Sequence, residues 1–156
     1  MTPWTLELPD PDATRRLGRA LGQALRPGLV VALEGDLGAG KTALAKAAIA
    51  AAGGVDEDDV VSPTFIIAAE YPGAPEVLHV DAYRLESPGA FVDLGFGALE
   101  EGPRAVLIEW ADRIAAALPG DRLTVRLAHA DPARRATLEA GGPASAAALE
   151  AVRAVV

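Results

Sequence analysis

Eight consecutive residues have the types and the spacing of a phosphate-binding loop. They read Gly-Asp-Leu-Gly-Ala-Gly-Lys-Thr and fit the pattern G-x-x-x-x-G-K-[ST] at every fixed position. Glycines let the backbone N–H groups converge on phosphate oxygens in torsions that a Cβ would obstruct. Lys41 would reach the β and γ oxygens, and the Thr42 hydroxyl would bind Mg²⁺. The sequence therefore predicts a nucleoside triphosphate site that includes Asp36, Leu37, Gly38, Ala39, Gly40, Lys41 and Thr42.

The segments around this loop are those that the motif requires. Residues 29–33 form a short apolar run typical of a strand, and residues 42–50 are rich in strong helix formers. The loop is thus expected at a helix N-terminus, where the helix dipole favours anions. The chain has two lysines against twelve arginines, so composition alone does not explain a lysine at position 41.

Two carboxylates follow other apolar runs, and a triphosphatase needs acids that hold Mg²⁺ directly or through water. Asp81 follows residues 77–80, and Glu109 follows residues 105–108. If these runs are strands parallel to the one before the loop, both acids stand at the same sheet edge as Thr42. The alternative for each is an ordinary acid at a strand end, and Glu109 is also a candidate for orienting the attacking water.

Two further positions carry weaker signals. Ser62-Pro63-Thr64-Phe65 precedes a predicted strand, and the Thr64 hydroxyl is a candidate γ-phosphate sensor of the switch type. The same four residues are also typical of a simple turn. Trp110 either lies against the nucleotide or packs in the core.

The remaining pattern predicts an α/β fold. Residues 14–25 have helical apolar spacing, residues 66–71 and 77–81 read as a hairpin, and residues 88–103 read as a loose stretch. The other expected elements are a loop at 56–59, a short helix at 114–118, strands at 123–127 and 135–138, and a helix at 143–156. We predict one domain over residues 1–156, a three-layer sandwich of the P-loop NTPase type with a mixed, mostly parallel central sheet.

Composition narrows the chemistry. The chain has no cysteine and two histidines, so disulfides, thiolate metal sites and histidine-rich metal sites are not expected. The net charge of −8 opposes the phosphate backbone, so any contact with RNA is expected to be indirect or to need a local arginine patch or a partner. No window approaches the roughly twenty apolar residues of a membrane span, and no basic segment precedes an apolar stretch at the N-terminus. We expect a cytoplasmic protein without membrane contact.

Four motifs occur in a characteristic order. They are Gly35 to Thr42, then Ser62-Pro63-Thr64-Phe65 with Tyr71 downstream, then His79-Val80-Asp81-Ala82-Tyr83-Arg84-Leu85, then Leu107-Ile108-Glu109-Trp110. In this order they resemble the TsaE (YjeE) family, the ATPases of tRNA threonylcarbamoyladenosine biosynthesis. The motifs span about half the chain, and the last three are much more specific than the phosphate loop. The stretch 95–104 and everything after Asp112 match only loosely.

The resemblance implies an ATPase whose loop backbone and Lys41 bind the phosphates of ATP. It implies work with the partner proteins TsaB and TsaD, which install a threonylcarbamoyl group on the adenosine after the anticodon of tRNAs that read A-starting codons. The chain itself would not be the transferase, and it would meet tRNA only indirectly or through the complex.

The resemblance also implies roles within the site. Thr42 and Glu109 would coordinate Mg²⁺, and Asp81 would support the metal or the attacking water. Thr64 would belong to a switch-like catalytic loop, and Trp110 would lie near the nucleotide.

Other functions use the same loop. A small-molecule kinase would move the phosphoryl group to an acceptor other than water, but it commonly needs a lid with several arginines, and residues 66–81 contain none. A nucleotide-gated binding module would use bound ATP to order the Thr64 loop for a partner and would hydrolyse it slowly. A GTPase is disfavoured because its Asn-Lys-x-Asp guanine-reading motif needs an asparagine, which this chain lacks.

Overall fold

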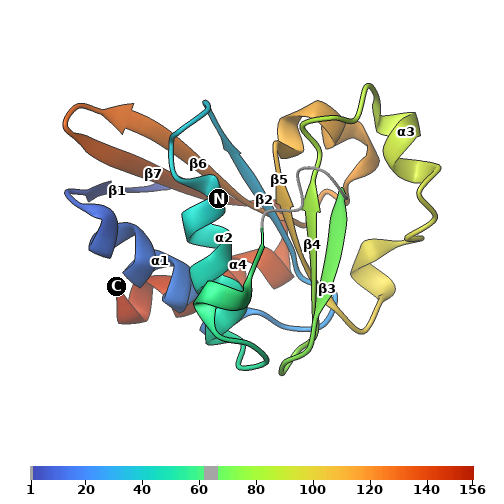
Figure 1. Ribbon diagram of the computed structural model, residues 1–156, viewed down its shortest axis with the longest axis horizontal. Coiled ribbons are helices and arrows are strands. Elements are labelled where there is room, and N and C mark those ends of the chain that lie inside the picture. Colours follow the sequence, from blue (N-terminus) through green and yellow to red (C-terminus); the bar gives the residue numbers. More distant parts are fainter. Residues whose placement is uncertain (1, 62–66) are drawn as a thin grey trace.

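A seven-stranded mixed sheet forms the centre of the structure (Figure 1). The structure is a computed structural model that describes residues 2–61 and 67–156. In spatial order the strands are β1 (Trp4–Leu8), β7 (Ala133–Ala140), β6 (Leu123–Ala130), β2 (Val30–Gly35), β5 (Ala105–Glu109), β4 (Val77–Asp81) and β3 (Ala68–Tyr71). The four strands β6, β2, β5 and β4 are mutually parallel, whereas β7 and β3 run antiparallel to the neighbours that they extend. The predicted mixed, mostly parallel sheet is confirmed.

Helices cover both faces at the centre of the sheet, as Figure 1 shows. The elements are α1 (Pro11–Ala24), α2 (Lys41–Ala51) and α4 (Pro143–Val155) on one face, and α3 (Pro88–Val92) with the 3₁₀ helix η3 (Ala111–Ala117) on the other. Along β2, Val31 and Leu33 join the core beneath α1, α2 and α4, whereas Val30 and Ala32 join the core that contains Phe91 of α3. The alternation of one buried strand thus builds both cores, and the three-layer prediction is confirmed.

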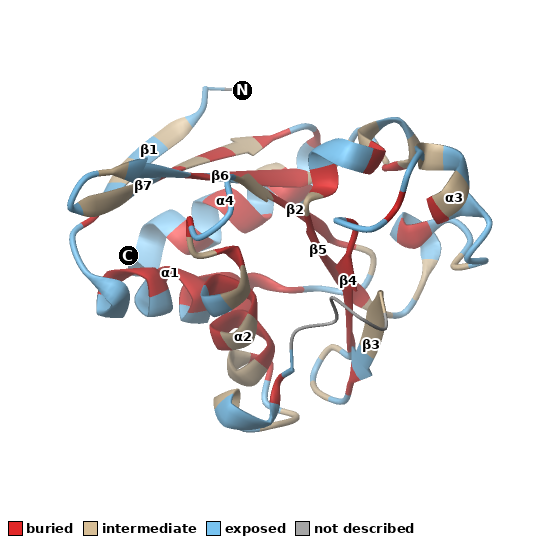
Figure 2. Cartoon of the chain, turned by 45° about the horizontal axis from the view of Figure 1, so that its top comes forward, coloured by how far each residue is buried: buried red, intermediate tan, exposed pale blue. Residues whose placement is uncertain are grey.

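Among the described residues, the outer strands β1, β7 and β6 have helices on one face only. Their other face carries a network of charged side chains. Arg135 of β7 donates to Glu7 of β1 at 2.7 Å, and Arg126 of β6 donates to Glu139 at 2.9 Å and to Glu34 at 3.3 Å. Figure 2 shows the contrast with β4 and β5, which are buried along their whole length. The sandwich has three layers over the central strands and two layers over this outer half.

Helix α1 holds α2 in place through an unusually close contact. Added Cβ atoms would lie 2.7 Å from the Leu44 carbonyl oxygen at Gly18 and 2.3 Å from the Ala48 carbonyl oxygen at Gly22. Only glycine allows this approach of the two helices. The phosphate loop leads directly into α2, so this contact helps to fix the loop against the sheet.

The element boundaries show where the sequence was informative. Helix α1 begins at Pro11, earlier than predicted, because the Asp10 side chain caps it by accepting from the N–H of Ala13 at 2.8 Å. The predicted hairpin of residues 66–81 is confirmed for β3 and β4, and Ile66 lies outside the described residues. Strands β6 and β7 are each longer than predicted and form one continuous hairpin.

Three predictions need correction, and one strand was missed. Strand β1 was not predicted, because its alternation is short and follows a proline. The stretch 88–103 is not entirely loose, since it contains α3, which Ser87 caps by accepting from the N–H of Ala90 at 3.1 Å. The run at 56–59 contains a 3₁₀ turn at Glu57–Asp59, and the helix expected at 114–118 is η3, which begins at Ala111.

Within the described residues, no helix combines the length and apolar character needed to cross a bilayer.

We expect Gly22→Ala to lower the free energy of unfolding by about 1 to 3 kcal/mol, because the new methyl group meets backbone that cannot move aside easily. Urea denaturation measures this change. Gly120→Ala is the matched control, since its Cβ would meet nothing within 4 Å. Equal effects of the two substitutions would contradict the close contact between α1 and α2.

The start of α4 depends on an acid from another part of the chain. Its first residues follow Gly142, which has no side chain with which to cap them. Asp121 accepts instead from the N–H groups of Ala144 and Ser145, each at 2.9 Å, and from the Ser145 hydroxyl at 2.6 Å. Burial raises the pKa of Asp121, but the hydrogen bonds from Ser145 and Ala144 outweigh it and hold this pKa below its ordinary value of 3.8.

We expect Asp121→Ala to cost about 1 kcal/mol of unfolding free energy at neutral pH, as the loss of a helix cap does. The folded-state pKa is depressed, so this contribution is fully present above the ordinary carboxyl pKa and is lost as the pH falls through the folded value. Urea denaturation of both proteins at pH 7 and at acidic pH measures the difference. A difference that stays constant down to the lowest pH would contradict the assignment.

Candidate functional site

The loop between β2 and α2 has the backbone conformation of an anion-binding turn. Gly38 and Gly40 have φ of 78° and 107°, in the left-handed region that favours glycine. Gly40 is also the N-cap residue of α2, and it has no side chain to occupy the first N–H groups of the helix. These N–H groups and the positive end of the helix dipole are therefore available to a phosphate group.

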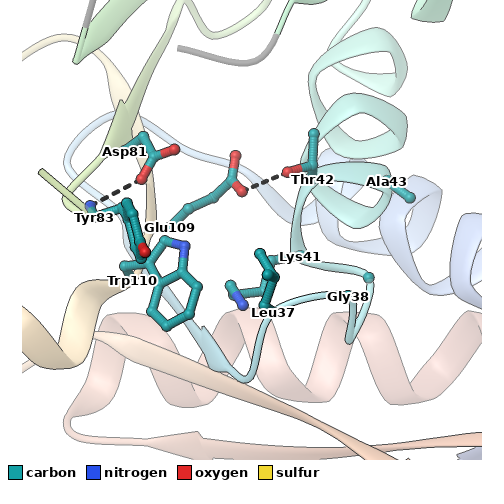
Figure 3. Close-up of a pocket in the computed structure, with 10 residues that line it drawn as sticks. Leu37, Gly38, Lys41, Thr42, Ala43, Asp81, Tyr83, Glu109 and Trp110 are labelled. Carbon is teal, nitrogen blue, oxygen red and sulfur yellow. Dashed lines mark hydrogen bonds between the residues drawn. The ribbon is translucent and has the colours of Figure 1, made fainter. Parts of the chain in front are cut away.

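A cavity of about 360 Å³ lies against this loop, at the carboxyl ends of β2, β5 and β4. Figure 3 shows the side chains that meet there from the loop, from β4 and from β5. The lining residues are Leu37, Gly38, Gly40, Lys41, Thr42, Ala43, Asp81, Tyr83, Glu109 and Trp110.

Most of the predicted site residues thus come together around one cavity. Asp36 and Ala39 belong to the loop but are not among the residues that line the cavity. Thr64 lies outside the described residues, so its role stays a prediction.

The two predicted carboxylates are neighbours. Asp81 and Glu109 stand opposite each other at the ends of the parallel strands β4 and β5, and both are almost fully buried. The Thr42 hydroxyl donates to Glu109 Oε1 at 2.7 Å, and the N–H of Tyr83 donates to Asp81 Oδ1 at 2.9 Å (Figure 3). A hydroxyl from the loop and two carboxylates from the sheet therefore face the same space.

Lys41 is buried and folds back over the loop. Its ammonium donates to the carbonyl oxygens of Gly35 and Asp36, the latter at 2.9 Å, and lies 4.0 Å from the ring centroid of Trp110. Desolvation by burial lowers the pKa of Lys41, although the acids Glu109, Asp112, Asp36 and Asp81 oppose the shift. The ammonium is buried, and the two carbonyl groups to which it donates are neutral acceptors. An anionic ligand would therefore stabilise its charged form.

The oxygen atoms in the cavity suit a Mg²⁺ site of few protein ligands better than a metal cage built from protein side chains alone. Among the residues that the structure describes, no three of the types His, Cys, Asp and Glu gather as a metal cage. Mg²⁺ is commonly held by one or two carboxylates together with substrate phosphates and water. Thr42, Glu109 and Asp81 line one cavity beside the loop, and their oxygen atoms could hold an ion of that kind.

A second cavity, of about 430 Å³, lies on the other side of the loop. It shares Gly38 and Gly40 with the first cavity and is bordered by Thr14 and Arg15 of α1 and by Arg134 of β7. The phosphate loop therefore separates two adjoining spaces, one acidic at its wall and one bordered by arginines.

Comparison with known proteins identifies the family. Residues 8–137 match the family model described as threonylcarbamoyl adenosine biosynthesis protein TsaE. The chain belongs to the TsaE family. The TsaE protein of Treponema pallidum is 40% identical over 114 residues, which cover 73% of this chain and 83% of that protein. The TsaE protein of Bacillus subtilis is 38% identical over 136 residues, 85% of this chain and 83% of that protein.

A solved structure supports the same relationship. The crystal structure of Bacillus subtilis YdiB superposes with a TM-score of 0.81 at 28% identity, and the match covers 98% of this chain and 95% of the other. The family resemblance drawn from the motifs and the predicted fold class are both confirmed.

Sequence reasoning missed part of the site of this TsaE family member. Tyr83 lies against Trp110, with ring centroids 5.0 Å apart, and the Arg113 guanidinium lies 4.8 Å from the Tyr83 centroid. Trp110 has a φ of 58°, which is uncommon for a bulky residue and turns its ring toward Lys41 (Figure 3). The motif of residues 79–85 could have indicated Tyr83 as a site residue. No sequence pattern indicated Arg113, because its contacts depend on the turn at Trp110.

We expect Lys41→Met to raise the midpoint of thermal unfolding of the nucleotide-free protein, because it removes a desolvated charge and keeps a similar volume. Differential scanning calorimetry measures this change. Lys46→Met, on the same helix but away from the lining of the first cavity, is the control and should change the midpoint less. A lower midpoint for Lys41→Met would show that the contacts of its ammonium outweigh its desolvation.

Proposed function

We propose that this chain is a P-loop ATPase that binds and hydrolyses ATP with Mg²⁺ in support of tRNA threonylcarbamoyladenosine modification. One observation carries the proposal. The phosphate loop presents Lys41 and Thr42 to a cavity whose opposite wall is formed by the buried carboxylates of Asp81 and Glu109. A site with a loop for phosphates on one side and acids for a metal and water on the other is suited to triphosphate hydrolysis.

Phosphate binding requires a change of partner at Lys41. Its ammonium now donates to the carbonyl oxygens of Gly35 and Asp36. A triphosphate offers full negative charge in place of these neutral acceptors, so exchanging the carbonyls for phosphate oxygens relieves the desolvation that lowers the pKa of Lys41. The N–H groups at the start of α2 bind the same phosphates.

Thr42 and Glu109 would hold Mg²⁺, and Asp81 would bind one of its waters or orient the water that attacks. Bound Mg²⁺ would neutralise charge on the β and γ phosphate oxygens. The chain shields these carboxylates from bulk water and holds them in position: Glu109 is 2% exposed and Asp81 is 4% exposed. Carboxylates that are already positioned need little reorganisation when substrate arrives.

We place the nucleoside in the second cavity, beyond the loop. Its 430 Å³ is within the range of small-molecule pockets, and the Arg134 side chain at its border, which also donates to the Gly38 carbonyl oxygen at 3.5 Å, offers donors to a base or a ribose. The Trp110 ring would then lie on the phosphate side of the loop, near the metal and not against the base.

The biological setting rests on the family. The matched relatives are named tRNA threonylcarbamoyladenosine biosynthesis protein TsaE, and 16 curated proteins match significantly. We propose that this chain acts with TsaB and TsaD proteins and meets tRNA only indirectly or through that complex. The net charge of −8 supports an indirect contact, because it opposes the RNA backbone.

The test is Mg²⁺-dependent ATP hydrolysis by the purified chain, alone and with TsaB and TsaD proteins. We expect Glu109→Gln to lower the rate by at least about 10- to 100-fold, the usual cost of losing a group behind a metal ligand, and to leave ATP binding in EDTA unchanged, because it keeps the shape of the side chain but removes its charge. Lys41→Ala is the blank and should bind ATP weakly.

Unchanged hydrolysis by Glu109→Gln would remove Glu109 from the site. Stimulation by the two proteins would support the role in tRNA modification. If they change nothing while the chain transfers phosphate from ATP to metabolites of a cell extract, the protein is a kinase and the proposal is wrong.

A further inference from the structure

A histidine lies directly behind the site. His79 is fully buried in the middle of β4, two residues before Asp81 and therefore on the same face of the sheet. Its register partner on β5 is Leu107, so Glu109 is its diagonal neighbour on that face. His79 does not line the cavity beside the phosphate loop, and it reaches that cavity only through Glu109.

His79 and Thr42 together engage both oxygens of the Glu109 carboxylate. His79 Nε2 lies 2.6 Å from Glu109 Oε2, whereas the Thr42 hydroxyl donates to Oε1 at 2.7 Å. A carboxylate only accepts, so His79 Nε2 must carry the hydrogen of the first contact. The two bonds divide the carboxylate: one oxygen is anchored inside the sheet, and the other faces the loop.

The other ring nitrogen of His79 shows that this arrangement has a cost. Nδ1 is buried and has no hydrogen-bond partner in the part of the chain that the structure describes. A buried polar atom left without a partner costs about 1 to 3 kcal/mol. A leucine would fill such a position without that cost, so packing alone does not account for a histidine whose one formed bond is to Glu109.

Without this anchor, the Glu109 carboxylate would have a competing partner. Glu109 and Lys41 line the same cavity, and their opposite charges attract each other there. An ion pair between them would withdraw one group from the phosphates and the other from the metal. The bond to His79 opposes that movement.

We propose that His79 is a positioning residue that fixes the Glu109 carboxylate, so that one oxygen stays beside Thr42 for Mg²⁺ and does not pair with Lys41. The proposal rests on the Mg²⁺-dependent ATP site described above. It makes His79 part of the shell behind a metal ligand, where a ring N–H that donates to the ligand orients it. His79 touches neither the nucleotide nor the metal in this arrangement.

The experiment measures binding of the fluorescent nucleotide MANT-ATP, first in EDTA and then against increasing Mg²⁺. We expect His79→Leu to bind MANT-ATP in EDTA more weakly than the wild type does, because the released Glu109 carboxylate then pairs with Lys41 and competes with the phosphates. The Mg²⁺ concentration at half-saturation should rise by about 10- to 100-fold, the usual effect of losing a group that orients a metal ligand. His79→Gln retains an N–H in a similar position and should recover most of this loss.

Thr124→Val is the control for the loss of a buried polar group elsewhere. Thr124 lies on β6 and is 7% exposed, away from Glu109, so its substitution should leave the Mg²⁺ curve unchanged. A His79→Leu curve equal to that of the wild type overturns the inference. Equal weakening by His79→Leu and His79→Gln also overturns it, because the retained N–H would then have no effect.

A measurement on the unmodified protein covers the case in which His79→Leu does not fold. The chain has two histidines, so ¹H–¹⁵N NMR spectra of the ring nitrogens can be assigned with a His129→Gln variant. We expect His79 to be protonated on Nε2, and protonation on Nδ1 alone overturns the inference. A wild type that binds Mg²⁺ and MANT-ATP but does not hydrolyse ATP contradicts the proposed ATPase only, because the Mg²⁺ curves still decide the role of His79.

Discussion

The parallel register of β2, β5 and β4 is the constraint on which the site depends. Parallel strands end at the same edge of a sheet, so the loop after β2 and the acids that end β5 and β4 meet without any long connection. Leu33 stands opposite Glu109, and Glu109 stands opposite Asp81. Successive residues of a strand point to opposite faces, so a slip of one residue would turn an acid away from the loop and toward the core that contains Phe91.

Burial gives these groups their chemistry and also makes them costly. The carboxylates of Asp81 and Glu109 and the ammonium of Lys41 are all buried. A charged group is less stable in a buried position than in water. The apolar clusters on both faces of the sheet stabilise the fold and offset the free-energy cost of burying these charges. The close contact of α1 with α2 adds rigidity, because it restricts movement of the loop relative to the acids that line the same cavity.

The sequence predicted the elements whose signals are local. The loop, the buried strands and the two strand-end acids are each encoded within a few consecutive residues, and the sheet brings them together as the apolar pattern indicated. The contacts that the sequence could not reveal join distant positions. His79 and Glu109 are 30 residues apart, and Asp121 caps α4 from 24 residues before Ser145. Each partner taken alone is an ordinary polar residue, and only the folded chain shows that they form a pair.

The two edge strands affect how copies of this protein behave toward one another. Strand β1 has five residues and β3 has four, and each carries an exposed glutamate, Glu7 or Glu70, held by an arginine of a neighbouring segment. A foreign strand could add to either edge over a short length only, and it would have to displace water from charged side chains. The open sheet is thereby a poor template for aggregation, even though the described helices cover only one face of its outer half.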